Sequence, residues 1–441
     1  MSVTSTSKGV NALVLGYGRS GKAAEALLCR SGFTVTVLDG EAKFPEGDFM
    51  VAVVSPGIAL THSWIVEAKR RGIPLKSELQ FGCEELKRQG WKLLAVTGSK
   101  GKSSVVKVVA DAINLAGMHA VACGNYGLPV SAVALESGSG RDPAPPASIT
   151  GGAESFPLRR YAVVEVSSFM METTELPADT FEAATILNLQ EDHLDRHGSV
   201  ETYHGLKRKL LTMAVEKFDM SAFDGHRLRE SACQDGPDEE YWSSYFDNEI
   251  LARNALAAWY LMVSVKPVLD AKVRTRAFRE FVPLPHRMNR IATIDEVEYI
   301  DDSKATSLAA LEAGVRMSWS GPSEFRKLVA KLGFPWRRRV LLIAGGLPKG
   351  DDPKSVVSIL TERVKKVYLI GQSAEVFASA WKSCVDCEVC GTMDVAVAAA
   401  KREAVKGEKV LLSPGTASFD QFKSFGERGD VFARLVKKEN R

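Results

Sequence analysis

One segment constrains the fold of this 441-residue chain more than any other, the sequence VTGSKGKSS at residues 96–104. An apolar run at residues 93–96 precedes it, and a helical pattern at residues 105–115 follows it. Glycines in such a strand–loop–helix turn let backbone N–H groups approach phosphate oxygens, and the helix N-terminus adds a favourable dipole. The usual loop has a glycine where this chain has Val96, so we interpret the motif as the shorter form G-x-x-G-K-S and predict a nucleotide site.

The loop residues divide into backbone donors, a cation and a metal ligand. Lys102 can reach the β- and γ-phosphates of a nucleotide, and the Ser103 hydroxyl can bind Mg²⁺. The alternative is a Gly- and Lys-rich turn on a solvent-exposed face. The residues expected to bind ATP here are Gly98, Ser99, Lys100, Gly101, Lys102, Ser103 and Ser104.

A second glycine motif, GYGRSG at residues 16–21, also follows an apolar run and opens a helical pattern. Asp39 ends the next apolar run, a spacing that fits a dinucleotide fingerprint and by itself favours an NAD-dependent oxidoreductase. A UDP group also carries a diphosphate and a ribose, so the motif does not separate the two ligands. Tight packing of a helix on a strand is a third interpretation.

Short apolar runs alternate with helical patterns along the chain, which predicts an α/β protein with parallel sheets. We expect three domains: a Rossmann-like domain at residues 1–90, a P-loop domain at 91–282 and a second Rossmann-like domain at 283–441. Irregular segments are expected at residues 136–160 and 219–247, which are polar or rich in Pro, Gly and Ser. The expected strands are residues 12–15, 35–38, 51–55, 93–97, 161–166, 340–344, 366–370 and 410–413, and a helix is expected at Glu249–Val263.

The charge balance and the apolar pattern argue against several other classes of protein. Lys and Arg number 57 and Asp and Glu 54, so the net charge of +3 argues against a dedicated nucleic-acid binder. No apolar run has the length of a membrane span, and the first residues lack the apolar core of a signal peptide. We therefore expect a cytoplasmic monomer with neither a nucleic-acid nor a membrane partner.

Three of the seven cysteines form a C-x-x-C-x-x-C pattern at Cys384, Cys387 and Cys390. Such spacing is known from metal and iron–sulfur sites. No fourth Cys or His follows nearby, so we expect these cysteines to lie in a strand end and a loop between two α/β units.

Polar residues follow other expected strands, which is where the sites of open α/β sheets lie. Glu165 stands at the end of such a run and suits Mg²⁺, and the alternative is a solvated or paired glutamate. Lys207 comes one helical turn after Tyr203, and by spacing alone it is better interpreted as a solvated helix residue. Residues 187–197, LNLQEDHLDRH, bring together Asp192, His193, Asp195 and His197.

The third expected domain contains four further polar segments, and in the last three of them polar or glycine residues follow an apolar run. The segments are PHRMNRI at residues 285–291, YIDDSKATS at 299–307, LLIAGGLPKGDD at 341–352 and LLSPGTASFDQFKSFGERGDVF at 411–432. Arg287, Lys304 and Lys349 would supply positive charge for anionic groups, or they are ordinary surface cations.

Taken together, these motifs resemble those of the Mur ligase family, over nearly the whole chain and in family order. The matching segments are TGSKGKSS, DHLDRH, PHR, DSKAT and SPGTASFDQFKSFGERG, and the last two favour the D-glutamate-adding members. The resemblance implies an ATP-dependent amide ligase of peptidoglycan precursor synthesis. It would add D-glutamate to UDP-N-acetylmuramoyl-L-alanine through an acyl phosphate.

The resemblance also implies roles for individual residues. Catalysis would involve Lys102, His193, Lys207 and Lys304, and ATP would further contact Asn254, Arg287 and Asp302. D-glutamate would be bound by Thr306, Lys349, Ser418 and Phe425. One or two Mg²⁺ ions would be held by Ser103, Glu165, His193 and Lys207, the last as a carbamylated lysine. The UDP substrate would be bound by Gly16, Gly18, Arg19, Ser20, Gly21, Asp39, Ser55, Gly57, Asn125 and Ser167.

The chain departs from the family pattern in two places. The His-Asn pair expected before Asn254 falls at Ile250 and Leu251, and the stretch from Lys207 to Asn254 is short, so we expect weaker adenine binding. Gly40 and Glu41 stand where a Thr-Arg pair is expected near the UDP group. The alternatives are another Mur or folylpolyglutamate-type ligase, an NAD-dependent oxidoreductase, and a non-catalytic nucleotide-binding protein.

Overall fold

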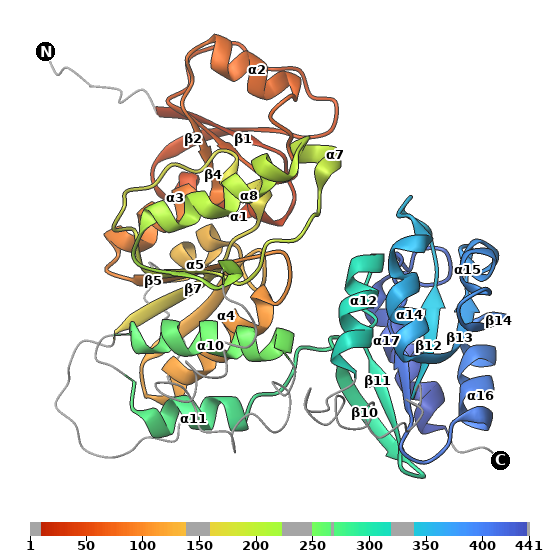
Figure 1. The fold of residues 1–441 in the computed structure, drawn as a ribbon. Coiled ribbons are helices and arrows are strands. Elements are labelled where there is room, and N and C mark those ends of the chain that lie inside the picture. Colours follow the sequence, from red (N-terminus) through yellow and green to blue (C-terminus); the bar gives the residue numbers. More distant parts are fainter. Residues whose placement is uncertain (1–9, 138–158, 223–248, 266–268, 319–338, 439–441) are drawn as a thin grey trace, which may run out of the picture. The chain divides into compact units, whose positions relative to one another are not determined.

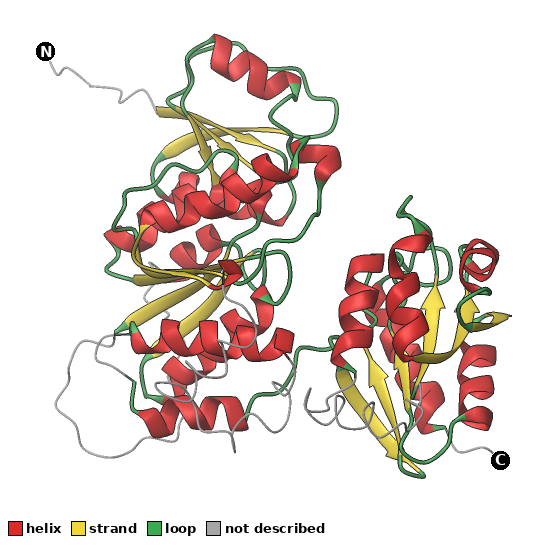
Figure 2. Ribbon diagram, in the orientation of Figure 1, coloured by secondary structure: helices red, strands yellow, loops and turns green. Residues whose placement is uncertain are grey.

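The computed structural model describes residues 10–137, 159–222, 249–265, 269–318 and 339–438. The chain forms two compact units, Met1–Phe281 and Val282–Arg441 (Figure 1). Each unit combines sheets of mainly parallel strands with helices, which confirms the predicted α/β class (Figure 2). A further division of the first unit near residue 91 remains a prediction.

The first unit begins with a four-stranded parallel sheet of order β2-β1-β3-β4. Its strands β1 and β3 are rich in Val, Leu and Ala because both faces of the sheet are covered. Leu28 of α1 packs on one face and Trp64 of α2 on the other. The elements are β1 (Val10–Leu15), α1 (Arg19–Arg30), β2 (Phe33–Leu38), β3 (Val51–Val54), α2 (Ser63–Arg70) and β4 (Leu75–Ser77).

A five-stranded parallel sheet of order β6-β7-β5-β8-β9 forms the rest of this unit. One core joins this sheet to α3 and α5, and α10 and α11 contact α4 (Figure 1). The strands are β5 (Lys92–Thr97), β6 (His119–Gly124), β7 (Arg160–Glu165), β8 (Phe181–Ile186) and β9 (Ala214–Asp219). The helices are α3 (Glu78–Arg88), α4 (Lys102–Leu115), α5 (Val130–Ser137), α6 (Ser168–Met171), α7 (Leu194–His197), α8 (Val200–Lys209), α10 (Glu249–Val263) and α11 (Ala271–Arg279), with short 3-10 helices η1 (Leu210–Met213) and η2 (Met220–Ala222).

The second unit contains a six-stranded sheet of order β10-β11-β15-β12-β13-β14, in which only β10 runs antiparallel to its neighbour. Helices α12, α14 and α15 cover one face, and α16 and α17 cover the other. The strands are β10 (Asn289–Ile294), β11 (Val297–Asp301), β12 (Val340–Gly345), β13 (Val364–Ile370), β14 (Asp386–Gly391) and β15 (Lys409–Leu412). The helices are α12 (Leu308–Met317), η4 (Pro353–Val356), α14 (Val357–Arg363), α15 (Ala374–Trp381), α16 (Met393–Glu403) and α17 (Phe425–Lys437).

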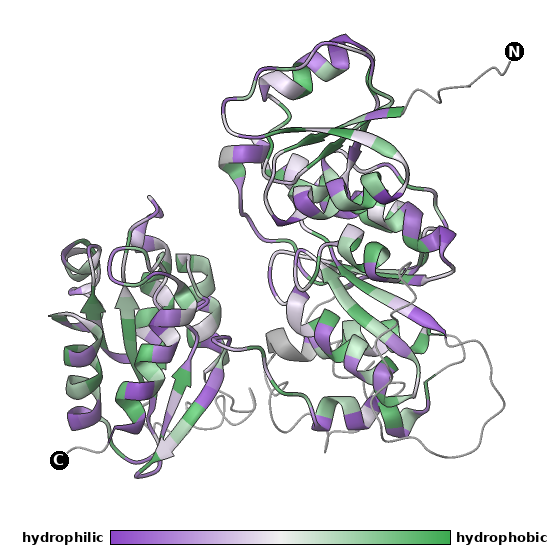
Figure 3. Ribbon diagram, turned by 180° about the vertical axis from the view of Figure 1, so that it is seen from behind, coloured by the Kyte–Doolittle hydropathy of each residue, from purple (hydrophilic) through white to green (hydrophobic). Residues whose placement is uncertain are grey.

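The apolar runs singled out in the sequence form strands of these sheets, which are coloured largely hydrophobic in Figure 3. Most of their residues are buried, but in the run at residues 35–38, on the edge strand β2, only Leu38 is buried. The helix predicted at Glu249–Val263 is α10, with the same bounds. Most of the predicted irregular segments 136–160 and 219–247 lie outside the described residues. None of the described helices is long and apolar enough to cross a membrane.

The three spaced cysteines do not gather at one point. Cys384 lies in the turn before β14, and Cys387 and Cys390 lie within β14, which agrees with the expected strand end and loop. Cys384 and Cys387 pack against the core under α12, α14 and α15, whereas Cys390 packs against the core on the opposite face of the sheet. No group of three or more Cys, His, Asp or Glu that could hold a metal ion occurs among the described residues.

Candidate functional site

The glycine–lysine loop leaves the carboxyl end of β5, the middle strand of its sheet. Gly98 and Gly101 have positive φ angles of 149° and 88°, conformations that L side chains rarely adopt. Asn188 closes the loop from the neighbouring strand end: its Oδ1 accepts from the N–H of Lys100 (2.9 Å) and its Nδ2 donates to the Lys100 carbonyl (3.0 Å). The backbone of Gln190 likewise pairs with the Ser99 hydroxyl, at 3.0 and 3.1 Å.

Lys102 is the first residue of α4, and its side chain folds back over the loop. Its Nζ donates to the carbonyls of Gly98 (2.8 Å) and Ser99 (3.2 Å). Ser103 and Ser104 are buried in the first turn of the helix. The loop therefore places an ammonium group and a helix N-terminus together, a combination suited to a phosphate chain.

Glu165 ends β7, the strand beside β5. Its Oε1 accepts from Asn125 Nδ2 (2.7 Å), while its buried Oε2 has no hydrogen-bond partner among the described residues. A buried carboxylate oxygen without a donor fits a divalent cation, which prefers oxygen ligands. Ser167 follows as the N-cap of α6, where its hydroxyl accepts from the N–H of Met170.

Lys207 is buried, with 2% of the residue exposed, so its spacing-based interpretation as a solvated residue is wrong. Its Nζ donates to the Gly98 carbonyl (3.1 Å) and lies 4.5 Å from the centre of the Tyr203 ring. Burial, and secondarily the charge of Lys102, lowers the pKa of Lys207 to about 7. A large share of this amine is therefore neutral and nucleophilic near neutral pH.

The residues after β8 divide into two groups. His193 is exposed and has a φ of 54°. Its neighbour Asp192 lies beside the glycine–lysine loop, with Oδ2 at 4.0 Å from Lys100 Nζ. His197 is instead buried: its Nε2 is 3.0 Å from Ser168 Oγ and its Nδ1 is 3.4 Å from Glu172 Oε1. Burial lowers the pKa of His197. The side chain of Asp195 lies outside the described part of the structure.

The GYGRSG loop of the first sheet is packed tightly against its own strand. A Cβ on Gly21 would lie 1.9 Å from the Gly16 carbonyl oxygen, so only glycine fits there. Ser55 Oγ donates to that same carbonyl (2.7 Å), and Asp39 Oδ1 accepts from the N–H of Tyr17 (3.2 Å). Arg19 donates to the Gly127 carbonyl (2.5 Å). Gly18, which caps α1, and Gly57 are exposed, and Ser20 is half-buried.

In the second unit, the predicted residues follow the adjacent strands β11, β15 and β12. Lys304 Nζ lies 3.8 Å from the centre of the Phe425 ring, and Ser303 Oγ donates to the Phe425 carbonyl (2.8 Å). Ser418 is buried, Thr306 is half-buried and Lys349 is exposed.

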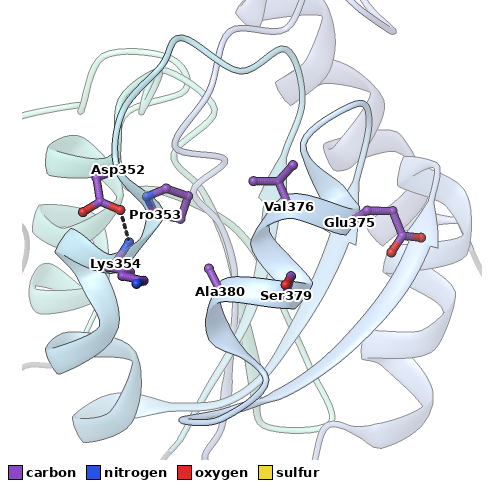
Figure 4. A pocket seen from close by; sticks show the side chains of 7 residues that line it. All are labelled: Asp352, Pro353, Lys354, Glu375, Val376, Ser379 and Ala380. Carbon is purple, nitrogen blue, oxygen red and sulfur yellow. Dashed lines mark hydrogen bonds between the residues drawn. The ribbon is translucent and has the colours of Figure 1, made fainter.

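Lys349 lines a cavity of about 150 Å³ together with Leu308, Gly415 and Thr416. The Thr416 hydroxyl has no hydrogen-bond partner among the described residues. A second and more open hollow, formed by η4 and α15, lies nearby (Figure 4). None of the sequence-predicted residues lines this second hollow. It is lined by Asp352, Pro353, Lys354, Glu375, Val376, Ser379 and Ala380.

Two residues that were predicted to contact ATP, Asn254 in the first unit and Asp302 in the second, are both buried. Asn254 is 1% exposed, and its side chain lies so close to Gly101 that a Cβ placed on Gly101 would be 2.3 Å from Asn254 Nδ2. Asp302 accepts from Ser413 Oγ (2.9 Å) and from the N–H of Met288 (3.3 Å). Burial raises the pKa of Asp302 to about 7, against the opposing effects of these hydrogen bonds and of the half-buried Arg287.

We expect Asp302→Asn to stabilise the second unit at pH 8. The folded chain holds a proton on Asp302 between pH 3.8 and about 7 that the unfolded chain releases, so the free energy of unfolding falls as pH rises through this window. The Asn variant avoids that loss, with a gain of about 1–4 kcal/mol at pH 8 and little difference near pH 4. Thermal unfolding at both pH values measures it, with Asp430→Asn at an exposed carboxylate as the control. Equal stability of wild type and variant at pH 8 would contradict the expectation.

The sequence analysis did not find several residues that build the site. Asn188 and Gln190 close the glycine–lysine loop, and Glu172 and Ser168 hold His197. A signal for the first pair was present, since both lie in the polar segment directly after an apolar run. Their contacts with Ser99 and Lys100 depend on strands that are adjacent only in the fold.

The parallel sheets, the glycine–lysine loop at a central strand end and the buried acid beside it define a P-loop nucleotide-binding α/β protein. Residues 96–226 match the family model described as Mur ligase middle domain. The UDP-N-acetylmuramoylalanine–D-glutamate ligases of Chlamydia caviae and Nitratidesulfovibrio vulgaris are each 30% identical to the chain, covering 96% of it and 97% and 95% of the relatives. The chain therefore belongs to the UDP-N-acetylmuramoylalanine–D-glutamate ligase family of Mur ligases.

A solved structure shares the fold at low sequence identity. The MurF ligase from Thermotoga maritima, in complex with ADP, is 14% identical, with a TM-score of 0.54. The match covers 97% of this chain and 94% of that protein.

Proposed function

We propose that the chain is an ATP-dependent ligase that joins D-glutamate to UDP-N-acetylmuramoyl-L-alanine, with release of ADP and phosphate. The observation that carries this proposal is the convergence of Lys102, Glu165 and Lys207 on one phosphate-type loop. The substrates come from the names of relatives that align over nearly the full length of the chain.

The reaction must activate a carboxylate, because an amine cannot displace oxide. A carboxylate oxygen of the L-alanyl group attacks the γ-phosphorus of ATP, and the bond to ADP breaks. The amine nitrogen of D-glutamate then attacks the carbonyl carbon of the acyl phosphate. Phosphate leaves with the former carboxylate oxygen, and the nitrogen gives up its extra proton. Positioning and neutralisation of charge supply most of the catalysis in such phosphoryl transfers.

The residues of the first unit fit these demands. Lys102 is held at the loop, where its ammonium group can exchange the Gly98 and Ser99 carbonyls for phosphate oxygens. Glu165, Ser103 and His193 would hold Mg²⁺, and the unpartnered Glu165 oxygen supports this role. When bound, the metal would supply positive charge to the phosphate groups. The glycine loop at residues 16–21, in which Gly18 and Arg19 are exposed, would bind the UDP diphosphate.

One assay tests the function directly. Phosphate release is measured with ATP, Mg²⁺ and UDP-N-acetylmuramoyl-L-alanine, with and without D-glutamate. We expect sustained release only with all substrates present, and an amide product of the matching mass. Calorimetry with the UDP substrate and with NADH tests the first-sheet loop, and tight binding of NADH alone would favour the oxidoreductase alternative.

We expect Lys349→Ala to raise the KM for D-glutamate by about tenfold. The amine of D-glutamate must be free to react, so the protein has to bind the substrate through its two carboxylates. A charge-assisted hydrogen bond to a carboxylate changes the affinity by about 10- to 100-fold. Lys349 lines the cavity beside Thr416, where one carboxylate would be bound. Steady-state kinetics for each substrate measure the effect. Lys354→Ala, at the neighbouring open hollow, is the matched control, and an equal KM shift there would contradict the assignment.

We further expect Lys207 to be carbamylated. Its neutral amine would add to CO₂, forming an N–C bond and releasing one proton, and the resulting carbamate would offer oxygen ligands in place of an ammonium group. Because the pKa of Lys207 is about 7, the amine is largely neutral near pH 8 and largely charged near pH 6, so the modification should be more extensive at the higher pH. NMR with ¹³C-labelled bicarbonate measures it. A carbamate signal that persists in Lys207→Arg would place the modification elsewhere, and its absence at pH 8 would refute it.

A further inference from the structure

Arg196, in the short helix α7, joins two loops that come from different sheets of the first unit. Its Nε and one terminal nitrogen donate to the two carboxylate oxygens of Glu172, at 3.0 and 2.7 Å. Its terminal nitrogens also donate to the carbonyls of Pro56 (3.2 Å), Gly57 (3.3 Å) and Ile58 (2.9 Å). One guanidinium group thus links the loop after β3 to the segment after β7.

The loop after β3 lies directly against the GYGRSG loop. Ser55 Oγ donates to the Gly16 carbonyl (2.7 Å), and the N–H of Ile58 donates to the Ser55 carbonyl (3.0 Å). A Cβ on Gly16 would lie 3.0 Å from the Ile58 side chain, so there is little free space between the two loops. A shift of residues 56–58 would therefore change the shape of the glycine loop.

On its other side, Arg196 contacts the residues around His193. Its own N–H donates to the His193 carbonyl (3.1 Å). Its guanidinium lies 4.9 Å from the centre of the Phe169 ring, and that ring lies 4.7 Å from the ring of His193. Phe169 and Glu172 belong to the segment that follows Glu165, so the same arginine braces both strand ends beside the glycine–lysine loop.

We propose that Arg196 is a positioning residue that fixes the UDP-binding glycine loop relative to the phosphoryl-transfer site. This inference rests on the proposed function, because it takes the GYGRSG loop as the UDP site. A planar guanidinium can donate to a carboxylate and to several carbonyls at once, whereas a lysine ammonium cannot reproduce that fork. Arg196 itself need not touch substrate for its loss to affect both substrate binding and turnover.

The test compares wild type with Arg196→Lys and Arg196→Met in full kinetics for each substrate. We expect the KM for UDP-N-acetylmuramoyl-L-alanine to rise about tenfold and kcat to fall in Arg196→Lys, with larger effects in Arg196→Met. The KM for ATP and the calorimetric affinity for ADP should stay within about twofold. A variant that merely contained less folded protein would lose kcat without any change in KM, so the KM shift is the decisive readout.

Arg30→Lys is the matched control. Arg30 also reaches across the unit to backbone carbonyls, those of Ala134 and Leu135, but at the far end of α1 from the glycine loop. Its substitution should leave the KM for the UDP substrate unchanged. An equal KM rise in Arg30→Lys, or an unchanged KM in both Arg196 variants, would overturn the proposal.

The function and the inference fail in different ways. If wild type does not turn over the UDP substrate, the proposed function is wrong. Calorimetry with UDP alone as the probe then still tests whether Arg196 positions the glycine loop. Weaker UDP binding in the Arg196 variants but not in Arg30→Lys supports it, whereas equal UDP binding in all of these proteins, or no UDP binding by wild type, overturns it.

Discussion

Replacement of Lys102 by alanine should lower kcat by about 10²–10³-fold, because a preorganised charge aimed at a transition state is typically worth that much. The ammonium group is already held at the loop by the carbonyls of Gly98 and Ser99, so little reorganisation is needed when phosphate oxygens replace them. Single-turnover phosphate release measures the chemical step directly. The calorimetric affinity for ADP should change far less than the rate.

Lys107→Ala is the matched control for this variant. Lys107 lies on the same helix, where it pairs with Asp111 and lies 5.2 Å from the centre of the Phe281 ring. Its loss should change kcat by no more than about twofold, as expected for a partly exposed pair. Near-normal turnover in Lys102→Ala would show that the loop does not act on the transferred phosphoryl group.

Replacement of Arg428 by methionine should lower the free energy of unfolding of the second unit by about 3–5 kcal/mol. The reason is that the buried oxygen atoms that accept hydrogen bonds from the guanidinium would lose their charged donor. Arg428 is fully buried in α17, and burial lowers its pKa to about 10. Its guanidinium donates to the Ser303 hydroxyl (3.0 Å) and to the carbonyls of Ser303 (2.9 Å), Thr416 (3.1 Å) and Ala417 (3.2 Å). It therefore ties the loop after β11 to the loop after β15.

Chemical denaturation followed by tryptophan fluorescence measures this loss. Arg434→Met is the control, because Arg434 lies on the same helix but is exposed, and its loss should cost no more than about 0.5 kcal/mol. Arg428→Lys should fall between wild type and Arg428→Met. Equal stability of Arg428→Met and Arg434→Met would contradict the conclusion that Arg428 stabilises the second unit by joining the loops after β11 and β15.

The buried strands and the glycine–lysine loop were predictable from the sequence. Parallel strands covered on both faces appear as short continuous apolar runs, as β12 and β15 do, and the loop needs glycines at fixed places. The edge strands β9 and β10 gave no comparable signal. They carry charged or polar residues such as Glu216, Lys217 and Arg290, because one side of an edge strand has no neighbouring strand.

The contacts of the candidate site were less predictable than its location. Lys207 was identified through the family resemblance, but its helical spacing predicted a solvated side chain rather than one buried against Gly98. Arg196 and Glu172 lie 24 residues apart, and Arg196 and Gly57 lie 139 apart. Such contacts depend on which strands become neighbours, and the local sequence does not specify that order.

The packing of α3 bears on how the protein can be divided into expressed fragments. Leu79, Cys83 and Leu86 of α3 belong to the core shared with β5, β7 and α5, although α3 precedes that sheet in the chain. A fragment that stops at residue 90 would expose this apolar face to water, and we would expect it to self-associate. A fragment of Val282–Arg441 keeps helices on both faces of its sheet and is the better candidate for separate expression.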